Sequence, residues 1–461
     1  IMHIFKKNIH SLFLISFAFL YLCIPHFLCA QDDTPSSLSD SLASTLQPQL
    51  RFMRVFGAQD ETAPPVVLCS RPGLDSKVNV SYAYKFITIQ FDVQSKIPPQ
   101  MFVVFKHCNA DWSEDNNSFL NDPALLRTSS IDWMMAPPAS IWYNYRGTLQ
   151  VPNEQVKFNY AGNWKAECYL FDDPDKPFAI AKFFVVDPKA ETILRVFGDF
   201  YSPQESIFTS GAYTLEATTR TINSMPDGQL NTAVFYRMNR YQEPFIVSEN
   251  SSYEEFSARR YSYEMPTMIS GFGSIGRRFR IEKIPAENEY RVLDLTDFSL
   301  YPRTNSPLRM WRPDLWRNGS FSELSDGGAM ITRYLSSGDM DYVNIEFLLN
   351  PQNRLAKHEV FISGSFNNFQ PDASWMMYYD EHVQLYRLRQ WIPRGRHSYQ
   401  YSTGTIHADT RLAEQLTTEE FEGNTARAAH NFIVLIYYRE FGFGGYDSII
   451  GIGGGNVNGS W

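Results

Sequence analysis

Short runs in which apolar and polar residues alternate recur along this chain, and a period of two is the pattern of a β-strand with one buried face. The clearest run is Phe86–Val93, with the sequence FITIQFDV. Val, Ile, Phe and Tyr, which favour strands, dominate these runs, and after residue 30 no long amphipathic helix stands out. With 44% hydrophobic residues the chain can bury a substantial core. The sequence therefore predicts a globular all-β protein.

The strand runs fall into three groups. At roughly 100 to 200 residues per domain, 461 residues suggest two to four domains, and we expect three β-sandwiches. They are predicted over residues 50–187, 188–300 and 341–450, with a turn-rich linker at 301–340 and a Gly-rich tail at 451–461. Besides Phe86–Val93, the predicted strands are Met101–His107, Phe178–Val186, Ala212–Thr219, Ala233–Met238, Phe279–Ile284, Tyr290–Leu295, Ala329–Tyr334, Tyr342–Leu349, Glu359–Ser363, Tyr386–Trp391, His397–Tyr401 and Asn431–Tyr438.

The N-terminal segment has the composition of a secretory signal peptide. Lys6 and Lys7 precede an apolar run from Leu12 to Ile24, and the small residue Ala30 stands before a polar stretch. This run is short of the ~20 apolar residues that a transmembrane helix needs. We expect a signal peptide over residues 1–30, a flexible leader over 31–49, and export of the chain.

Cysteine spacing gives no indication of a metal site. After removal of the predicted signal peptide, Cys69, Cys108 and Cys168 remain, so at most one intramolecular disulfide can form. Cys108 and Cys168 lie in apolar, strand-like contexts, which leaves both a disulfide and buried free thiols open. Because no C-x-x-C or H-x-x-x-H spacing occurs, the sequence predicts no metal ion and no other cofactor.

The motif search also gives no indication of an enzyme. Gly271, Gly273 and Gly276 have the G-x-G-x-x-G spacing of a nucleotide-binding turn, but an alternating RRFRIEK run follows, so we expect a hairpin or loop. The acidic cluster of Glu419, Glu420 and Glu422 is expected to be a solvated face. No G-x-S-x-G pattern occurs. We therefore predict no catalytic residues and no small-molecule substrate. We do not expect a nucleic acid as a partner, because the net charge is -9 and no basic stripe is present.

One group of motifs resembles a known family. The chain contains HCNADW at residues 107–112, Tyr143 and Tyr145, Val-Pro-Asn at 151–153, and YAGNW at 160–164. Their order and spacing are similar to the N-terminal domain of type IX secretion plug proteins. The chain departs from that pattern at Val151, Ala161 and Trp164. Trp112 and Trp164 are also expected to anchor a core, which is compatible with membership of the family.

A second motif lies in the third predicted domain. Residues 360–369, VFISGSFNNF, resemble the start of early-set immunoglobulin-like modules, which include glycogen-binding modules. The plug family carries such a module and continues with a pattern similar to Glu422-Gly423-Asn424, Tyr437-Tyr438 and Tyr446-Asp447. In glycan-binding modules a tryptophan occupies the position of Phe369. An alternative function is therefore glycan binding by a periplasmic or surface protein, for which the candidate residues are Phe369, Trp375 and Trp391.

The resemblance to plug proteins implies three tandem immunoglobulin-like β-sandwiches and a non-catalytic role. Such a protein would lie in the periplasm and close the periplasmic opening of the outer-membrane translocon β-barrel when no cargo occupies it. Its partners would be that barrel and other translocon subunits. Within the predicted linker, Trp311 and Trp316 are the candidate partner-binding residues, together with the Gly-rich tail. A secreted cargo protein is a third alternative.

Overall fold

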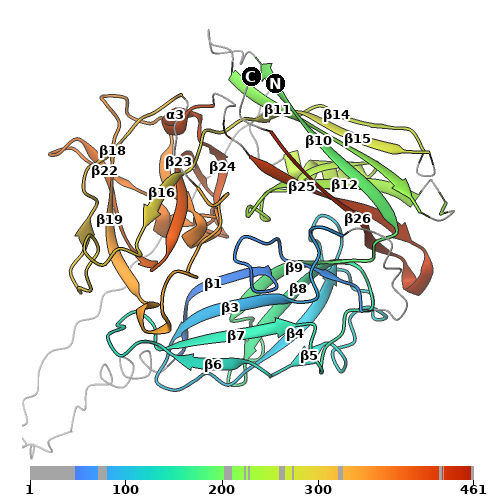
Figure 1. The fold of residues 1–461 in the computed structure, drawn as a ribbon, viewed down its shortest axis with the longest axis horizontal. Coiled ribbons are helices and arrows are strands. Elements are labelled where there is room, and N and C mark those ends of the chain that lie inside the picture. Colours follow the sequence, from blue (N-terminus) through green and yellow to red (C-terminus); the bar gives the residue numbers. More distant parts are fainter. Residues whose placement is uncertain are drawn as a thin grey trace, which may run out of the picture. The chain divides into compact units, whose positions relative to one another are not determined.

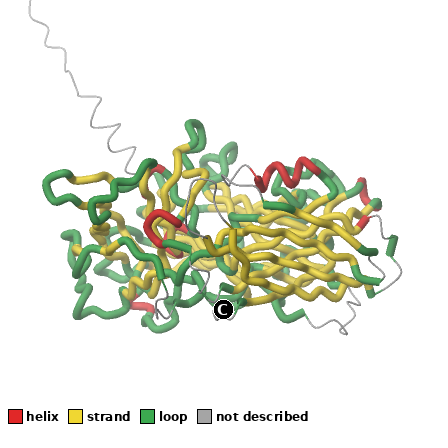
Figure 2. The backbone as a smooth tube through the Cα atoms, turned by 90° about the horizontal axis from the view of Figure 1, so that it is seen from above, coloured by secondary structure: helices red, strands yellow, loops and turns green. Residues whose placement is uncertain are grey.

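The computed structural model describes residues 47–70, 80–201, 210–222, 225–226, 229–258, 265–272, 275–319, 325–424, 428 and 430–457. Strands and loops make up almost all of the backbone (Figure 2). The helices are short: α2 (Ser251–Ala258), α3 (Glu419–Glu422), and the 3-10 helices η2 (Ser337–Asp339), η3 (Ser365–Asn367), η4 (Ala373–Trp375) and η5 (Gly442–Gly444). None of the helices in these ranges is long and apolar enough to span a membrane. The all-β prediction is confirmed. The predicted signal peptide and most of the leader lie outside the described residues.

The first module is a sandwich whose two sheets are formed before residue 187. One sheet has the order β1-β3-β7-β6, and the other contains β5, β4, β8 and β9, with β2 paired to β9. Ile89 and Phe91 of β3 pack against Phe105 of β4, Trp164 of β8 and Phe183 of β9. The strands are β1 (Gln49–Gly57), β2 (Val66–Leu68), β3 (Ile87–Gln94), β4 (Met101–Cys108), β5 (Arg127–Thr128), β6 (Asp132–Met135), β7 (Tyr145–Val151), β8 (Gly162–Leu170) and β9 (Ala179–Val186).

The second module pairs the sheet β10-β11-β15-β14 with strands β13 and β12. Its strands are β10 (Ala190–Tyr201), β11 (Ser210–Thr221), β12 (Leu230–Arg237), β13 (Phe245–Ser248), β14 (Thr267–Ser270) and β15 (Arg277–Pro285). β14 and β15 are antiparallel, with Ser270 opposite Arg278. The glycine motif therefore lies in a hairpin connection, as predicted, although Gly273 is outside the described residues.

The second module is completed by two strands that follow the third module in the sequence. β25 (Asn431–Glu440) and β26 (Tyr446–Asn456) lie between β12 and β9, in a nine-stranded sheet of order β13-β12-β25-β26-β9-β8-β4-β5 with β2 also paired to β9 (Figure 1). The sequence analysis had placed Asn431–Tyr438 in the third domain, and the structure differs. The cause is that β25 is apolar on both faces, as a central strand must be: Val434 points into the second core, while Leu435 points to the opposite side.

Residues Gly451–Asn456, which the sequence suggested were a tail, are part of β26. These positions need glycine because neighbouring atoms leave no room for a Cβ. A Cβ on Gly451 would lie 2.5 Å from Oγ1 of Thr192, and one on Gly453 would lie 3.0 Å from the Thr192 carbonyl oxygen. A Cβ on Gly454 would overlap the ring of Tyr82. The run of glycines thus allows β10 and Tyr82 to approach the strand from its two faces.

The third module has the sheets β16-β23-β20, with β24 beside β23, and β17-β19-β22-β21, with β18 beside β19. Its strands are β16 (Arg291–Asp294), β17 (Leu308–Arg309), β18 (Asp314–Leu315), β19 (Tyr342–Asn350), β20 (Glu359–Gly364), β21 (Tyr378–Asp380), β22 (Leu385–Pro393), β23 (Arg396–Ile406) and β24 (Ala413–Thr417). Val343 and Phe347 of β19 meet Ile362 of β20 and Tyr401 of β23 in its core.

The start of the third module also differs from the expected boundaries. β16 covers the strand predicted at Tyr290–Leu295, but it pairs with β23 and not with the second sandwich. The predicted linker contributes β17 and β18, both parallel to β19. The strand predicted at Ala329–Tyr334 is reduced to one bridge between Ile331 and Arg396. Pairing partners that are distant in sequence decide these assignments, and local alternation does not reveal them.

A further core joins the first two modules, and we call it the joint core. In β9, Phe183 and Val185 face the first core, while Phe184 and Val186 face the joint core. Trp112 and strands β12, β13, β25 and β26 contribute its other members. Because one sheet and one core run through both modules, they fold as a continuous body. The chain from Pro48 onward forms one compact unit.

Candidate partner-binding surfaces

The HCNADW motif lies at the junction between the first module and the β25–β26 pair. Nε2 of His107 donates to the carbonyl oxygen of Ala161 at 3.2 Å, and its Nδ1 lies 3.0 Å from Oδ2 of Asp115. Gly162 has a φ of +144°, and a Cβ there would overlap the His107 ring and lie 2.7 Å from the carbonyl oxygen of Asp447. These residues are buried, so the motif builds the junction and does not present a contact surface.

Side-chain hydrogen bonds close the same junction. Nδ2 of Asn163 donates to the Ala110 carbonyl at 3.2 Å, and its Oδ1 accepts from the Tyr437 hydroxyl at 2.7 Å. Oδ2 of Asp447 accepts from the Ala110 amide at 3.0 Å and from the Tyr253 hydroxyl at 2.8 Å. The motif loop is thereby tied to β25, β26 and α2. As predicted, Trp112 and Trp164 are core residues.

The third module is held to the first by a hydrogen bond to a buried ion pair and by an aromatic stack. Arg146 donates to both oxygens of Asp92, at 2.6 and 2.8 Å, and the Tyr342 hydroxyl donates to Oδ2 at 2.7 Å. Burial by itself would lower the pKa of Arg146. The adjacent Asp92 carboxylate has the larger effect, so the pKa of the guanidinium is raised. Trp142 and Trp391 stack with ring centres 5.1 Å apart. One end of the third module is thus covered.

The second and third modules meet around Glu287, which is 6% exposed. Its carboxylate accepts from Nη1 of Arg240 and lies 3.6 Å from Nη2 of Arg237. Burial opposes the charge on Glu287, but the two arginines outweigh it and lower its pKa to about 2. Phe369 of the third module packs against Tyr290, with ring centres 5.2 Å apart.

A second buried carboxylate, Glu422, supports this contact. It is 2% exposed and accepts from Nε of Arg291 at 2.8 Å, Nε of Arg317 at 2.7 Å and the Tyr401 amide at 2.9 Å. The prediction of a solvated acidic face is therefore wrong for Glu422, because a short helix turns it inward. Buried contacts thus join each pair of modules.

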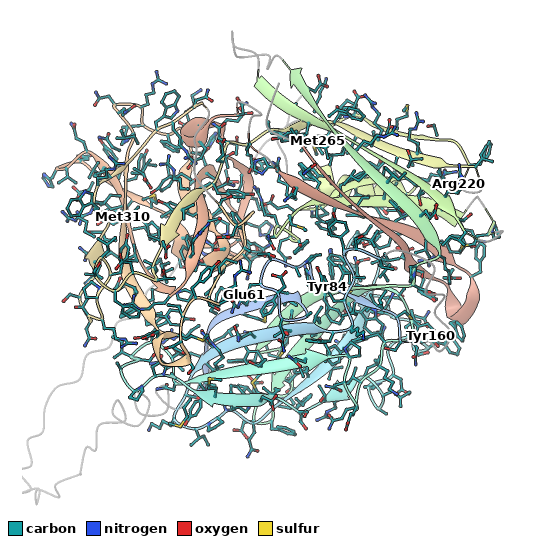
Figure 3. The ribbon with its side chains drawn as sticks, in the orientation of Figure 1. Glu61, Tyr84, Tyr160, Arg220, Met265 and Met310 are labelled. Atoms are coloured by element: carbon teal, nitrogen blue, oxygen red, sulfur yellow. The ribbon has the colours of Figure 1, made fainter. Side chains whose placement is uncertain are left out.

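The two linker tryptophans differ in exposure. Trp311 is 93% exposed, in the connection between β17 and β18. Trp316 packs against the third core, and the guanidinium of Arg354 lies 4.9 Å from its ring centre. Met310, next to Trp311, is labelled in Figure 3 on the third module. Of the two candidates, Trp311 is the one available to a partner.

The three glycan-binding candidates each have a protein ring against one face. Phe369 is 2% exposed and contacts Tyr290. Trp375 stacks on Phe366, with ring centres 4.9 Å apart, and Trp391 stacks on Trp142. Phe369 therefore offers no open stacking face to a sugar, and the other two offer one face at most.

An aromatic patch that the sequence analysis missed surrounds the β25–β26 turn, and we call it the Phe443 patch. Phe119, Phe441 and Phe443 are 66, 76 and 55% exposed. The backbone is fixed, because Asn117 donates to the Phe443 carbonyl oxygen at 2.5 Å and the Tyr160 ring lies 5.3 Å from that of Phe443. Tyr160 is labelled beside this turn in Figure 3. The sequence signal for this patch is FGFGG between two apolar strands. Phenylalanines in such a short turn cannot be buried, so they are exposed.

The junction of the second and third modules also encloses a cavity of about 420 Å³. Ser363, Gln400 and Ser402 of the third module line it, together with Arg237 and Glu287. Its size is within the range of small-ligand pockets. Four of the charged groups that line it, Arg237, Arg240, Glu243 and Glu287, form ion pairs with one another.

The three cysteines in the described part of the chain are thiols. Cys69, Cys108 and Cys168 are all buried. Burial raises the pKa of Cys108 to about 11 and that of Cys168 to about 12. Among the described residues, no group of His, Cys, Asp and Glu side chains is arranged to hold a metal ion.

Solved structures place the fold among known proteins. A hypothetical protein from Parabacteroides merdae ATCC 43184 is similar over 89% of this chain and 98% of that chain, with a TM-score of 0.67 and 19% sequence identity. At this identity the likeness shows the fold alone. The α2-macroglobulin of Escherichia coli, activated by porcine elastase, is aligned over 85% of this chain and 33% of its own, at 9% identity and a TM-score of 0.18, which supports no argument.

Comparison with families gives a more specific result. No curated protein matches the chain. Residues 75–187, which contain the HCNADW loop and strands β3 to β9, match the family model for the type 9 secretion system plug protein 1st domain. This agrees with the family that the sequence motifs indicated. Over residues 75–187, the chain therefore carries the first domain of the type 9 secretion system plug proteins.

Proposed function

We propose that this protein is a non-catalytic plug, which lies in the periplasm and occupies the periplasmic opening of the type 9 translocon barrel when no cargo is present. The observation that carries the proposal is the plug-domain match over residues 75–187. An open pore wide enough for folded proteins would leak solutes, so a resting translocon needs an occupant.

The architecture supports this proposal. A plug acts by steric occupancy, so it must resist deformation. The first and third modules are joined by the Tyr342–Asp92 hydrogen bond, the second and third by Arg240, which pairs with Glu287 and lies over the Phe369 ring, and the first and second by the joint core. A reversible seal also needs a broad interface that is not wholly apolar. The Phe443 patch and the surface around Trp311 are exposed aromatic surfaces suited to such contacts.

Deletion of the gene tests the proposal. In a strain with an assembled translocon, we expect the deletion to make the outer membrane permeable to antibiotics too large for ordinary porins, and the wild-type gene to restore resistance. The matched control is a strain that lacks both this protein and the translocon barrel, in which the leak should vanish. Unchanged permeability despite an assembled translocon would contradict plugging.

A further inference from the structure

One sheet face of the third module combines an exposed tryptophan with arginines. Its β17-β19-β22-β21 sheet is covered at one end, where Trp391 stacks on Trp142, and is open at the other. We call the open part the Trp311 face. It consists of Arg309, Trp311, Arg312, Glu346, Tyr378, Arg387 and Arg389.

Glu346 organises the arginines of this face. Its Oε1 accepts from Nη2 of Arg387 at 2.5 Å and from Nε of Arg389 at 3.1 Å, and its Oε2 accepts from Nε of Arg309 at 2.9 Å. Burial opposes the charge on Glu346, but these hydrogen bonds outweigh it and lower its pKa to about 2. One carboxylate thus accepts hydrogen bonds from three guanidinium groups and positions them relative to one another.

The face concentrates positive charge in an acidic protein. Four arginines stand against two carboxylates, Glu346 and Asp380, the second of which pairs with Arg387. The chain as a whole has a net charge of -9. Arg309 and Arg389 are 63 and 55% exposed on the side chain, so both can bind further carboxylates.

Trp311 is exposed from a rigid frame. β17 and β18, on either side of it, both pair with β19. The hydroxyls of Tyr399 and Tyr401 donate to Oδ2 of Asp314 at 2.7 and 2.8 Å, and the Met310 amide donates to the Glu346 carbonyl. Because the backbone beside Trp311 is held in place, less conformational entropy is lost when this segment binds a partner.

The chemistry of the face favours an acidic protein over a nucleic acid. Binding to a nucleic acid depends on neutralising many phosphates, whereas this face offers three exposed arginines, Arg309, Arg312 and Arg389, in a chain of net charge -9. All the cationic groups are guanidiniums, which pair with carboxylates through two parallel hydrogen bonds. Trp, Tyr and Arg are also the residues that dominate protein–protein hot spots.

We propose that the Trp311 face docks an acidic surface of a partner protein, with carboxylates on Arg309 and Arg389 around a buried Trp311 ring. This inference rests on the proposed function, since the partner meant is the translocon barrel. It goes further by naming the contact face and its charge.

Binding of the full-length protein to the purified barrel tests the inference. We expect Trp311→Ala to raise the dissociation constant at least ~10-fold, as for a hot-spot residue. Arg309→Glu combined with Arg389→Glu should do the same and flatten the salt dependence. The matched control is Arg220→Glu combined with Arg333→Glu, which makes the same charge change at exposed arginines elsewhere. This control should bind within ~2-fold of wild type. Unchanged circular dichroism melting excludes misfolding.

The outcomes separate the two proposals. If wild type binds the barrel and the Trp311-face variants bind it equally well, the assignment of the Trp311 face as the contact surface is wrong and the plug proposal stands. If wild type fails to bind the barrel, the plug proposal fails. A polyglutamate peptide should compete for the face, and competition by polyphosphate without competition by polyglutamate would overturn the choice of a protein partner.

Discussion

The Tyr342 hydroxyl in the third module donates to the same oxygen of Asp92 that Nη2 of Arg146 contacts in the first module. The three side chains are almost fully buried, so one carboxylate connects two modules whose strands are otherwise in separate sheets. A hydrogen bond to a buried charged group contributes more to stability than one between neutral groups.

Tyr342→Phe removes this hydrogen bond and little volume. We expect the free energy of unfolding to fall by about 1.5–3 kcal/mol. Urea unfolding followed by tryptophan fluorescence measures the change. Tyr378→Phe, at a 53% exposed tyrosine of the same module, is the control and should change stability by less than ~0.5 kcal/mol. Equal effects of the two substitutions would show that the Asp92 contact does not join the modules.

Gly162→Ala should be among the most damaging small substitutions in the first module. The added methyl group would overlap the His107 ring and the Asp447 carbonyl, and the φ of +144° is strained for alanine. We expect a loss of about 2–4 kcal/mol. Gly442→Ala, where no atom lies within 4 Å of the new Cβ, is the matched control and should leave the urea midpoint unchanged. A stable Gly162→Ala variant would mean that the junction can relax.

Stability should fall as the pH is lowered from about 6.5 to 4. Burial lowers the pKa of His430 and of His397 from 6.5 to about 4. In this window the unfolded chain binds protons that the folded imidazoles do not, so unfolding is favoured, by up to about 3 kcal/mol per histidine. The depressed pKa of Glu287 acts lower, between about 4.5 and 2.

The variant His430→Gln isolates one of these contributions. Its amide can still donate to the Glu287 carbonyl that accepts from His430 in the native protein. We expect it to lose about 2 kcal/mol less than wild type between pH 6.5 and 4.5, measured by urea unfolding at a series of pH values. Parallel stability curves for the two proteins would contradict a buried neutral imidazole at His430.

The thiols should be unreactive in the folded protein. Cys108 and Cys168 are 0% exposed and their pKa values are raised, so the reactive thiolate is scarce near neutral pH. We expect iodoacetamide to leave Cys69, Cys108 and Cys168 unlabelled in buffer and to label all three in concentrated urea without reductant. Peptide mass spectrometry reads this out. Labelling of only one of them in urea would reveal a disulfide.

Local sequence patterns predicted most strands of this fold but not their partners. The alternation in FITIQFDV correctly gave β3, because the apolar residues of that strand all belong to the first core: Ile87, Ile89, Phe91 and Val93. The run FIVLIYY in β25 showed a strand but was assigned to the wrong sandwich, since its partners, β12 and β26, are set by long-range pairing. A run apolar on both faces was the available signal for a central strand.

The candidate surface was predictable only in part. Trp311 was found because a tryptophan in a turn-rich segment is unusual, but Trp316, in the same segment, is half-buried. Glu346 could not be found from sequence, because its three arginines come from β17 and β22 and meet only across the sheet. Glu422 was misjudged for the same reason, since Arg291 and Arg317 are far from it along the chain.

The position of β25 and β26 has a consequence for biogenesis. A chain that emerges N-terminus first makes β9 and β12 long before the strands that fill the space between them, as the pairing of Val234 with Leu435 shows. Until then β12 exposes an unpaired edge, which invites aggregation, and such distant pairings form slowly. Copies truncated before β25 would keep this edge open, so a holding chaperone is expected to matter until β25 has been synthesised.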